Sequence, residues 1–215
     1  MKAWLAVMSA IFIVTLQGET LIAQGIADPS EFRKWDVAGT LGLFGSSRRY
    51  FVRTDSYYGD PVTVAGNFDV GRYLTTHLKA DFGVMTTHSR NVYDPGVYSD
   101  QFYSYSYVKA RPTTVSGAVT YQFFENVFAH PYVSAGLALT SINEERTVYS
   151  FTLPSRIPQT TAVSHERHLQ VSPFVAAGYK SYFNERAFMK SELLFAARPD
   201  RFSFGTLRIG FGIDF

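Results

Sequence analysis

Apolar and polar residues alternate one by one along much of this chain, and the pattern is clearest at its end. In residues 207–215, "LRIGFGIDF", a large apolar side chain stands at every second position, with arginine, glycine and aspartate between. Successive side chains of a β-strand point to opposite faces, so this stretch predicts a strand with one apolar and one polar face. The same alternation recurs in seven earlier segments: 35–44, 62–73, 78–87, 114–123, 131–140, 169–182 and 188–198.

The connections between these segments alternate in length. The short ones are 74–77, 124–130 and 183–187, and the others are 45–61, 88–113 and 141–168, with a brief one at 199–203. An even number of strands without a helical period predicts an all-β fold, an eight-stranded antiparallel up-and-down transmembrane barrel. The short turns then share one end of the barrel, an asymmetry typical of outer-membrane barrels, whose external loops are longer than their periplasmic turns.

The polar face of the predicted strands combines charged residues with glycine, alanine, serine and threonine. Small side chains suit the narrow interior of an eight-stranded barrel, and charges enclosed there must pair. The five acidic and four basic positions are Asp36, Asp69, Lys79, Asp81, Lys180, Lys190, Glu192, Arg208 and Asp214. We expect this face to line the lumen as a charge network and the apolar face to meet lipid; a soluble lipocalin-type barrel would turn the apolar face inward.

Aromatic residues gather near the ends of the predicted strands. Those near the short-turn end are Trp35, Tyr73, Phe123, Phe124, Phe128, Tyr132, Tyr182, Phe183, Phe188 and Phe215. Those near the other end are Phe44, Tyr107, Phe202 and Phe204. This distribution predicts two aromatic girdles at the membrane interfaces. Strands of about ten residues, rising ~3.3 Å each and tilted by ~40°, also span the apolar band of about 25 Å that such barrels present.

The N-terminus has the layout of a secretory signal peptide. Lys2 precedes an apolar stretch, 3–16, which is shorter than the ~20 residues of a membrane helix and is followed by more polar residues. We expect a signal peptide over 1–23, with cleavage after Ala23 or at the latest after Ala27, and a barrel domain over 28–215. The mature protein is therefore expected to be exported.

Composition narrows the functional classes further. The formal net charge of +2 and the absence of long basic blocks argue against a nucleic-acid partner. With no cysteine among its 215 residues, the chain has neither disulfides nor thiolate chemistry.

The chain resembles the OmpA/OmpX-type eight-stranded outer-membrane β-barrels. The residues that carry the resemblance lie on the apolar face of the last predicted strand: Leu207, Ile209, Phe211, Ile213 and Phe215. In that family such a strand, ending in phenylalanine, is the signal read by the outer-membrane assembly machinery. The resemblance implies a bacterial outer-membrane location and contact with outer-membrane lipids and lipopolysaccharide. In hydrocarbon every backbone polar group must be paired, so the last strand should close the ring against the first.

Two short motifs are candidate chemical sites. "SHERH" places His165 and His168 around Glu166, but residues three apart on a strand face opposite sides, which disfavours a metal pair. "THSR" contains His88 beside Ser89 and faintly resembles outer-membrane lipid A deacylases and acyltransferases. Adjacent strand residues also point apart, so these two do not form a nucleophile–base pair.

Other serines offer no better support for catalysis. Ser106 and Ser141 are conceivable partners for a histidine, but no pattern in the sequence brings them to one. We therefore assign no catalytic, cofactor-binding or metal-ligating residue and expect no enzymatic activity.

The function expected from the sequence is that of a monomeric structural scaffold that displays extracellular segments, with a lumen closed by charges. "YSYSY", within 98–111, predicts strands that continue beyond the membrane as a hairpin, and Lys109 and Arg111 there are candidates for binding lipopolysaccharide phosphates. The alternatives are a lipid A-modifying enzyme and a narrow OmpW-like channel for small hydrophobic solutes. Pro173, inside a predicted strand, should cause a bulge or lie outside the membrane.

Overall fold

A computed structural model describes most of the chain after residue 33. Its described residues are 34–46, 58–59, 62–94, 102–123, 129–152, 159–197 and 203–215. They all belong to one compact unit, Phe32–Phe215. The predicted signal peptide lies outside them. Within the described ranges, no helix has the length and hydropathy to cross a membrane.

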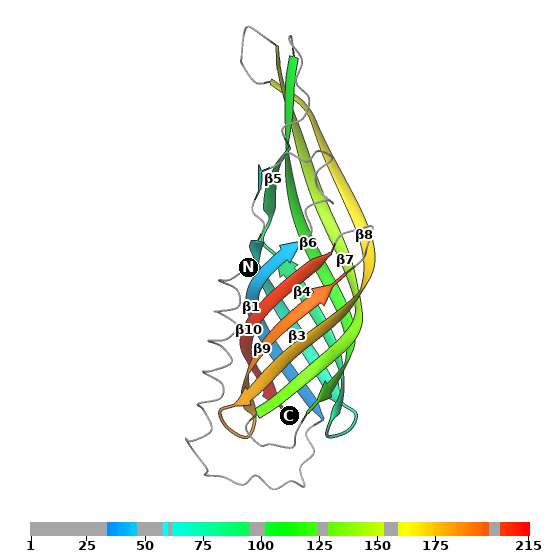
Figure 1. The fold of residues 1–215 in the computed structure, drawn as a ribbon, viewed down its shortest axis with the longest axis vertical. Coiled ribbons are helices and arrows are strands. Elements are labelled where there is room, and N and C mark those ends of the chain that lie inside the picture. The colour runs from blue at the N-terminus through cyan, green and yellow to red at the C-terminus, as the bar shows by residue number, and fades with distance from the viewer. Residues whose placement is uncertain are drawn as a thin grey trace. The chain divides into compact units, whose positions relative to one another are not determined.

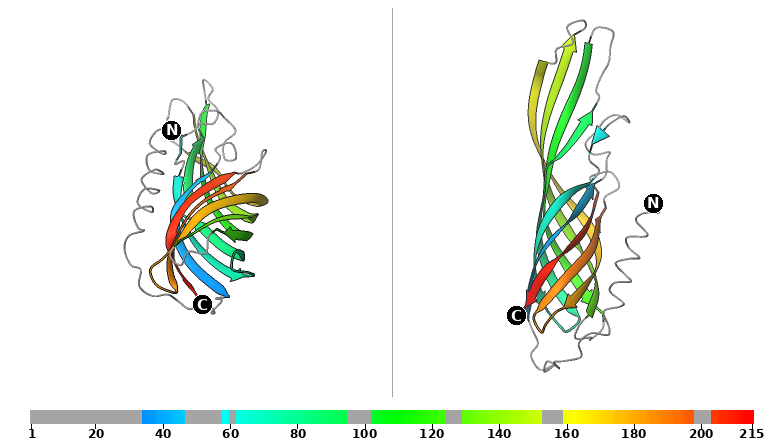
Figure 2. Two further views of the ribbon diagram at one scale, coloured as in Figure 1. Left: turned by 60° about the horizontal axis from the view of Figure 1, so that its bottom comes forward. Right: turned by 90° about the vertical axis from the view of Figure 1, so that its left-hand side faces the viewer.

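The described chain forms a closed antiparallel β-barrel (Figures 1 and 2). The eight barrel strands are β1 (Trp35–Ser46), β3 (Val62–Tyr73), β4 (Leu78–Thr87), β6 (Phe102–Gln122), β7 (Ala129–Thr152), β8 (Gln159–Tyr182), β9 (Ala187–Ala196) and β10 (Phe204–Asp214). Two short strands, β2 (Tyr58–Gly59) and β5 (Arg90–Asp94), lie outside the ring. Each barrel strand pairs with its neighbours in the sequence, and β10 pairs with β1, so the predicted up-and-down barrel is confirmed.

The strand boundaries agree well with the sequence pattern on one side of the barrel only. β3 and β4 coincide with the predicted segments 62–73 and 78–87. β6, β7 and β8 have 21, 24 and 24 residues, far more than the segments predicted for them. The sequence pattern located only their barrel halves, because the apolar-outward alternation ends where the strands leave the barrel.

The outer halves of β6, β7 and β8 form an extension of the barrel wall, which we call the extension (Figure 1). β6 pairs with β7 without interruption from Gln122 to Phe102. Beyond the end of β4, β5 takes over as the antiparallel partner of β6 on its other side. The prediction of loops over 88–113 and 141–168 was therefore wrong for most of their length. The hairpin predicted from "YSYSY" is confirmed, with tyrosine, valine and threonine favouring strand structure there.

Pro173 causes no bulge, contrary to expectation. It pairs in register with Leu137 of β7, and the register of these two strands shifts only between Val148 and Tyr149. The carbonyl oxygen of Pro173 accepts a hydrogen bond from Ala197 N at 3.3 Å, just past the end of β9. The backbone nitrogen and carbonyl of one residue in an antiparallel strand point toward the same neighbouring strand. The nitrogen of Pro173, which carries no hydrogen, therefore points toward the end of β9, where a missing donor does not interrupt the pairing.

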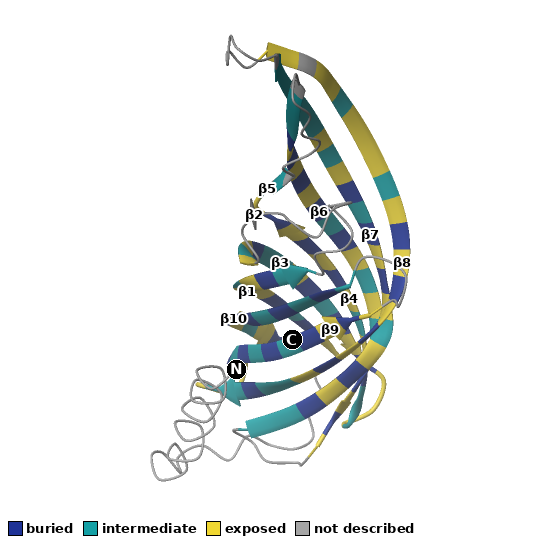
Figure 3. Ribbon diagram, turned by 45° about the horizontal axis from the view of Figure 1, so that its top comes forward, coloured by how far each residue is buried: buried dark blue, intermediate teal, exposed yellow. Residues whose placement is uncertain are grey.

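Burial in the barrel is inverted relative to a soluble protein (Figure 3). Large apolar side chains on the outer wall are exposed, as for Leu41 at 70% and Phe211 at 64%, while Lys79 and Lys180 are buried at 3% and 1%. The predicted orientation, with apolar groups outward and charges in the lumen, is confirmed. An exposed apolar wall around a closed sheet is what contact with lipid requires.

Candidate functional site

The lumen near the short-turn end holds a first cluster of ion pairs. Asp36 of β1 lies between two lysines: its Oδ2 is 2.7 Å from Lys79 Nζ and also contacts Lys180 Nζ. Lys79 Nζ reaches Asp81 Oδ1 at 2.8 Å, and Lys180 Nζ lies 3.6 Å from Asp214 Oδ1. Three carboxylates and two ammonium groups, contributed by β1, β4, β8 and β10, thus share one buried network.

Tyrosine hydroxyls complete this first cluster. Lys180 Nζ donates to Tyr73 Oη at 2.9 Å, and Tyr182 Oη donates to Asp214 Oδ2 at 2.5 Å. The Lys180 ammonium also lies 4.0 Å from the centre of the Phe188 ring, a cation–π distance. Each ion is therefore surrounded by groups that replace water, which a buried charge needs.

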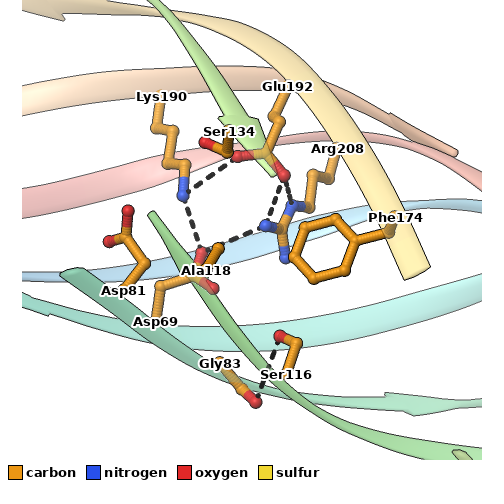
Figure 4. A pocket seen from close by; sticks show the side chains of 10 residues that line it. All are labelled: Asp69, Asp81, Gly83, Ser116, Ala118, Ser134, Phe174, Lys190, Glu192 and Arg208. Atoms are coloured by element: carbon orange, nitrogen blue, oxygen red, sulfur yellow. Dashed lines mark hydrogen bonds and ion pairs between the residues drawn. The ribbon is translucent and has the colours of Figure 1, made fainter. Parts of the chain in front are cut away.

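A second cluster lies beside the first and is balanced in charge (Figure 4). Lys190 Nζ is 2.9 Å from Asp69 Oδ2 and 3.2 Å from Glu192 Oε2. Arg208 donates to Glu192 Oε1 from Nε, at 2.8 Å, and from the terminal nitrogen Nη2. Nη2 of Arg208 also lies 3.5 Å from Asp69 Oδ2. Tyr132 Oη donates to Glu192 Oε2 at 2.7 Å. All nine charged residues expected in the lumen thus lie in these two clusters.

Glycines on the inner face make room for both clusters. A methyl group at Gly71 would lie 2.1 Å from Asp36 Oδ1, and one at Gly83 would lie 2.6 Å from Asp69 Oδ1. A methyl group at Gly178 would meet the Tyr132 hydroxyl at 2.3 Å. The small residues of the polar face therefore serve the close packing of the lumen as well as its narrow width.

The upper lumen, toward the extension, combines large apolar side chains with buried polar ones such as Thr140, Gln170 and Ser172. Its buried cluster includes Phe44, Met85, Ile142, Phe174 and Phe204, and the rings of Phe44 and Phe204 stack at 5.2 Å. The sequence analysis placed Phe44 and Phe204 in an outer girdle, which was wrong.

The girdle at the short-turn end is also thinner than predicted. Tyr73, Tyr132 and Phe188 point into the lumen and are buried. Exposed aromatic residues there include Trp35, Phe123, Phe183 and Phe215. Phe124, Phe128 and Phe202 lie outside the described residues. Aromatic residues near strand ends thus serve either the interface or the interior, depending on their face.

These packed layers leave little free space in the described lumen. One cavity among the ionic residues, lined by Asp69, Asp81, Lys190, Glu192 and Arg208, has a volume of about 20 Å³. That is room for about one water molecule.

The five residues named as the assembly signal lie on one face of the last strand. Ile209, Phe211, Ile213 and Phe215 are about half exposed or more on the outer wall, and Leu207 is partly exposed. Phe215 N donates to Trp35 O at 2.8 Å, and Trp35 N donates to Phe215 O at 2.9 Å. The final residue therefore completes the ring between β10 and β1.

Of the residues considered for catalysis, His88 and Ser141 lie near the rim between barrel and extension, and Ser106 lies farther along the extension, opposite Val148. The backbone N–H of His88 donates to Val64 O at 2.9 Å, and the His88 side chain is exposed. The Ser106 hydroxyl accepts from Arg146 at 3.4 Å, and the Ser141 hydroxyl accepts from Arg167 Nε at 3.0 Å. These two serines are thus held by arginines.

The "SHERH" residues lie in β8, on the extension. His168 Nε2 contacts Glu166 Oε2 at 3.2 Å on one face of the strand. His165 lies on the other face, as an i to i+3 separation in a strand requires.

Sequence reasoning missed the tyrosines of the ionic clusters and the apolar layer above them. The signal for both was present. Phe44 stands eight residues after Asp36, and Tyr132 stands two residues before Ser134. Because residues an even number of positions apart on a strand share a face, both aromatic residues are expected to point into the lumen. Residue type was given more weight than position, because aromatic residues at strand ends are typical of girdles.

Comparisons with known proteins support the fold. No protein-family model matches the sequence, and no curated protein is significantly similar to it. The N-terminal β-barrel domain of Pseudomonas aeruginosa OprF is similar in structure, with a TM-score of 0.53 and 18% identity, covering 86% of this chain and 100% of that one. The outer membrane protein OprG from Pseudomonas aeruginosa has a TM-score of 0.52 and 10% identity, covering 86% and 97%. With its ring of eight antiparallel strands and its exposed apolar wall, the chain has the fold of the eight-stranded outer-membrane β-barrels that its sequence resembles.

Proposed function

We propose that the protein is a bacterial outer-membrane barrel whose main role is to hold the extension outside the cell as a platform for surface contacts. The observation that carries this proposal is a change of the outward face along β6 and β7. In the barrel their outward residues are apolar and exposed, such as Val119 and Leu137. Past the rim the outward row holds exposed polar residues instead: Lys109 and Arg111 on β6, and Asn143 and Glu145 on β7.

This change places the membrane boundary near the rim. A sheet whose outer face meets lipid in one half and water in the other must lose its apolar outward row where the lipid ends. The ionic clusters connect the barrel strands across the lumen, which makes the barrel half a rigid base for the extension. We infer that the lumen supports this base and carries no solute.

The topology is tested by labelling, because the chain contains no cysteine. We expect a membrane-impermeant maleimide to label Val163→Cys, on the exposed face of β8 in the extension, in intact cells. Glu185→Cys, in the exposed turn before β9, should react only after the envelope is opened. Labelling of Glu185→Cys in intact cells with Val163→Cys protected would overturn the proposal.

We propose further that the outer face of β10 is the signal for the assembly machinery. Because Phe215 is exposed on the wall, Phe215→Ala removes little packing. The variant should therefore fold in detergent like the wild type but accumulate less in the outer membrane. Equal accumulation of the two proteins would contradict this assignment.

A second candidate function, a narrow channel for small hydrophobic solutes, is favoured by the apolar cluster in the upper lumen. The ionic clusters below it oppose passage along the axis. Uptake of an apolar dye into vesicles containing the protein, above that into vesicles carrying Phe44→Lys, would favour the channel over the platform.

The proposal assigns no catalytic step to the chain. Cells that lack the protein should retain an unchanged mass profile of lipid A and should lose surface attachment. A mass shift in lipid A would support the enzymatic alternative.

A further inference from the structure

An aromatic cluster lies on the outward face of the extension, beyond the polar row at the rim. Its members come from three neighbouring strands: Tyr93 of β5, Tyr103, Tyr105 and Tyr107 of β6, and Tyr149 and Phe151 of β7. They are cross-strand partners, with Tyr107 opposite Tyr93, Tyr105 opposite Tyr149 and Tyr103 opposite Phe151. Residues directly opposite one another on antiparallel strands share a face, so the six rings form one surface.

The rings of the aromatic cluster contact one another in a continuous series. The ring of Tyr107 lies 5.3 Å from that of Tyr93 and 5.7 Å from that of Tyr105. The ring of Tyr105 in turn lies 5.9 Å from that of Tyr103 and 5.1 Å from that of Tyr149. Tilted and stacked rings at such separations attract one another. Every tyrosine of the cluster is therefore linked to the others through ring contacts.

One pair in the cluster also touches through its hydroxyl groups. The hydroxyl oxygens of Tyr93 and Tyr103 are 2.9 Å apart and share a hydrogen bond. Both side chains are partly exposed. Tyr105 and Tyr149 lie nearly parallel, at 16°, but no hydrogen bond joins their hydroxyls within the described residues. The hydrogen bond thus distinguishes Tyr93 and Tyr103 by holding their polar ends together.

This arrangement suits a known reaction of phenols. A phenol that loses one electron and one proton becomes a radical whose unpaired electron is shared with the ring carbons beside the hydroxyl-bearing carbon. Two such radicals join through these carbons, and the ring hydrogens at the new bond then move to the oxygens, which gives dityrosine. Because the reacting carbons adjoin the hydroxyls, rings whose hydroxyls are in contact already present them to each other. Tyr93 and Tyr103 meet this condition.

We propose that Tyr93 and Tyr103 are a site of oxidative modification, at which a one-electron oxidant outside the cell, such as a peroxidase supplied with hydrogen peroxide, joins the two rings as dityrosine. Each phenol gives up one electron and one proton, and one carbon–carbon bond forms. Hydrogen peroxide takes up both electrons and both protons, its O–O bond breaks, and two water molecules result. The chain contains no cysteine, so no thiol competes for the oxidant. The inference rests on the proposed function only in placing the extension outside the cell.

Tyr107 is the entry point for the oxidant. It is 46% exposed, and its ring contacts that of Tyr93. An enzyme too large to enter the cluster can oxidise Tyr107, and an electron from Tyr93 then refills it across the ring contact. The hydrogen bond with Tyr103, together with partial burial, raises the pKa of Tyr93 to about 12, so near neutral pH this ring reacts as the neutral phenol.

The cross-link would stabilise the weaker edge of the extension. β5 has five residues, and its outer neighbour β2 has two. Short strands at an edge open locally more easily than long central ones. Tyr93 and Tyr103 are ten residues apart in the sequence, and a bond between them restricts the open state of β5 as a disulfide would. Oxidation therefore makes the edge of the extension more rigid.

The test treats the purified full-length mature chain in nanodiscs with a peroxidase and hydrogen peroxide. Dityrosine fluorescence measures the yield, and mass spectrometry of proteolytic peptides locates the bond. We expect an intramolecular product that has lost two hydrogen atoms and joins Tyr93 to Tyr103. Tyr103→Phe should lower the yield at least about tenfold, because phenylalanine has no hydroxyl to oxidise. The matched control is Tyr149→Phe, which removes a hydroxyl from the same cluster and should keep the wild-type yield.

Two further measurements test the role of Tyr107 and the effect on β5. Tyr107→Phe should give the same product more slowly. Hydrogen exchange of the β5 amides should slow by about tenfold after cross-linking, while exchange in β3 stays unchanged. An undiminished yield in Tyr103→Phe, with its barrel folded as judged by heat-modifiable gel mobility, overturns the proposal. A bond between Tyr105 and Tyr149, or one between two chains, in place of the expected bond also overturns it.

Intact cells separate the failure of this inference from that of the proposed function. A peroxidase does not cross the outer membrane, so it should produce the same cross-link in whole cells. If the purified protein forms no cross-link, this inference falls and the platform stands. If the purified protein forms the cross-link but whole cells do not, the extension does not lie outside the cell. That result overturns the proposed function and, with it, the external oxidant proposed here.

Discussion

The barrel and the extension are built from the same strands, yet they expose different kinds of residue on their outer faces. Along the barrel half of β7, the exposed outward residues are Leu137 and Leu139. A few residues on, in the extension, they are Asn143 and Glu145. Neither strand direction nor pairing changes between the halves. The difference therefore lies in the solvent outside the sheet.

This contrast shows what stabilises each half. The barrel has little reason to hide apolar groups, since lipid accepts them, and it encloses ions that must satisfy one another. The extension meets water, so its outward rows can carry charged residues such as Lys109 and Glu145, and its inner face holds both apolar Val108 and polar Ser106. A variant at matching positions in the two halves should consequently have different costs.

The largest difference is expected for carboxylates. Glu192→Gln removes the charge that Arg208 and Lys190 share in the lumen, whereas Glu145→Gln acts on the exposed outer face of the extension. We expect Glu192→Gln to lower the free energy of unfolding by about 3–5 kcal/mol, because it leaves buried cations uncompensated. Glu145→Gln should stay within about 0.5 kcal/mol of the wild type. Urea unfolding in lipid vesicles, followed by Trp35 fluorescence, measures both; equal values would remove the distinction between the halves.

Two valines on the outer face of β8 test the solvent directly. Val175 in the barrel and Val163 in the extension are 61% and 53% exposed. Val175→Arg should cost about 2–4 kcal/mol, because it places a charge in hydrocarbon, and Val163→Arg should cost almost nothing. The same unfolding experiment measures the pair. A cost for Val163→Arg as large as that for Val175→Arg would move the membrane boundary into the extension.

Two glycines separate the inner from the outer face of the barrel. A methyl group at Gly210 would lie 2.0 Å from Gly39 O, whereas one at Gly39 would have nothing within 4 Å. Gly210→Ala should therefore lower the free energy of unfolding by about 1–3 kcal/mol, through overpacking. Gly39→Ala should be close to neutral. If Gly210→Ala left the free energy of unfolding unchanged, the strands around Gly210 would have to shift more easily than their close packing indicates.

The smallest effect concerns pH and the inner face of the extension. Burial raises the pKa of the Glu144 carboxyl above its ordinary value of 4.5. Ionising Glu144 therefore costs more free energy in the folded state than in the unfolded state. This loss of stability is absent below pH 4.5 and grows as the pH rises through the raised pKa. Amide protection of β6 and β7 around Glu144 should therefore be lower near neutral pH than below pH 4.5. Glu144→Gln should remove this difference while leaving protection in β3 unchanged; a pH effect that persists in the variant would assign it to another group.

The alternation of apolar and polar residues and the lengths of the connections were enough to predict the barrel half of the fold. β3 and β4 were located to the residue, because their outer faces meet lipid and are apolar at most positions. The nine lumen charges were recognised for the same reason. The extension was underestimated, because Lys109 and Arg111 break the apolar face although the strand continues through them.

The sequence by itself determined that this chain forms a closed sheet with an apolar outer wall and charges inside, since a period of two leaves only two faces to assign. It could not decide which charges meet. Asp36 and Lys180 are 144 residues apart and come into contact only because β10 closes on β1. The tertiary structure also decided that Phe44 and Phe204 fill the upper lumen and that three strands bring Lys109, Arg111 and Arg167 to one groove. These are consequences of register and closure, which depend on pairings between distant segments that no local pattern specifies.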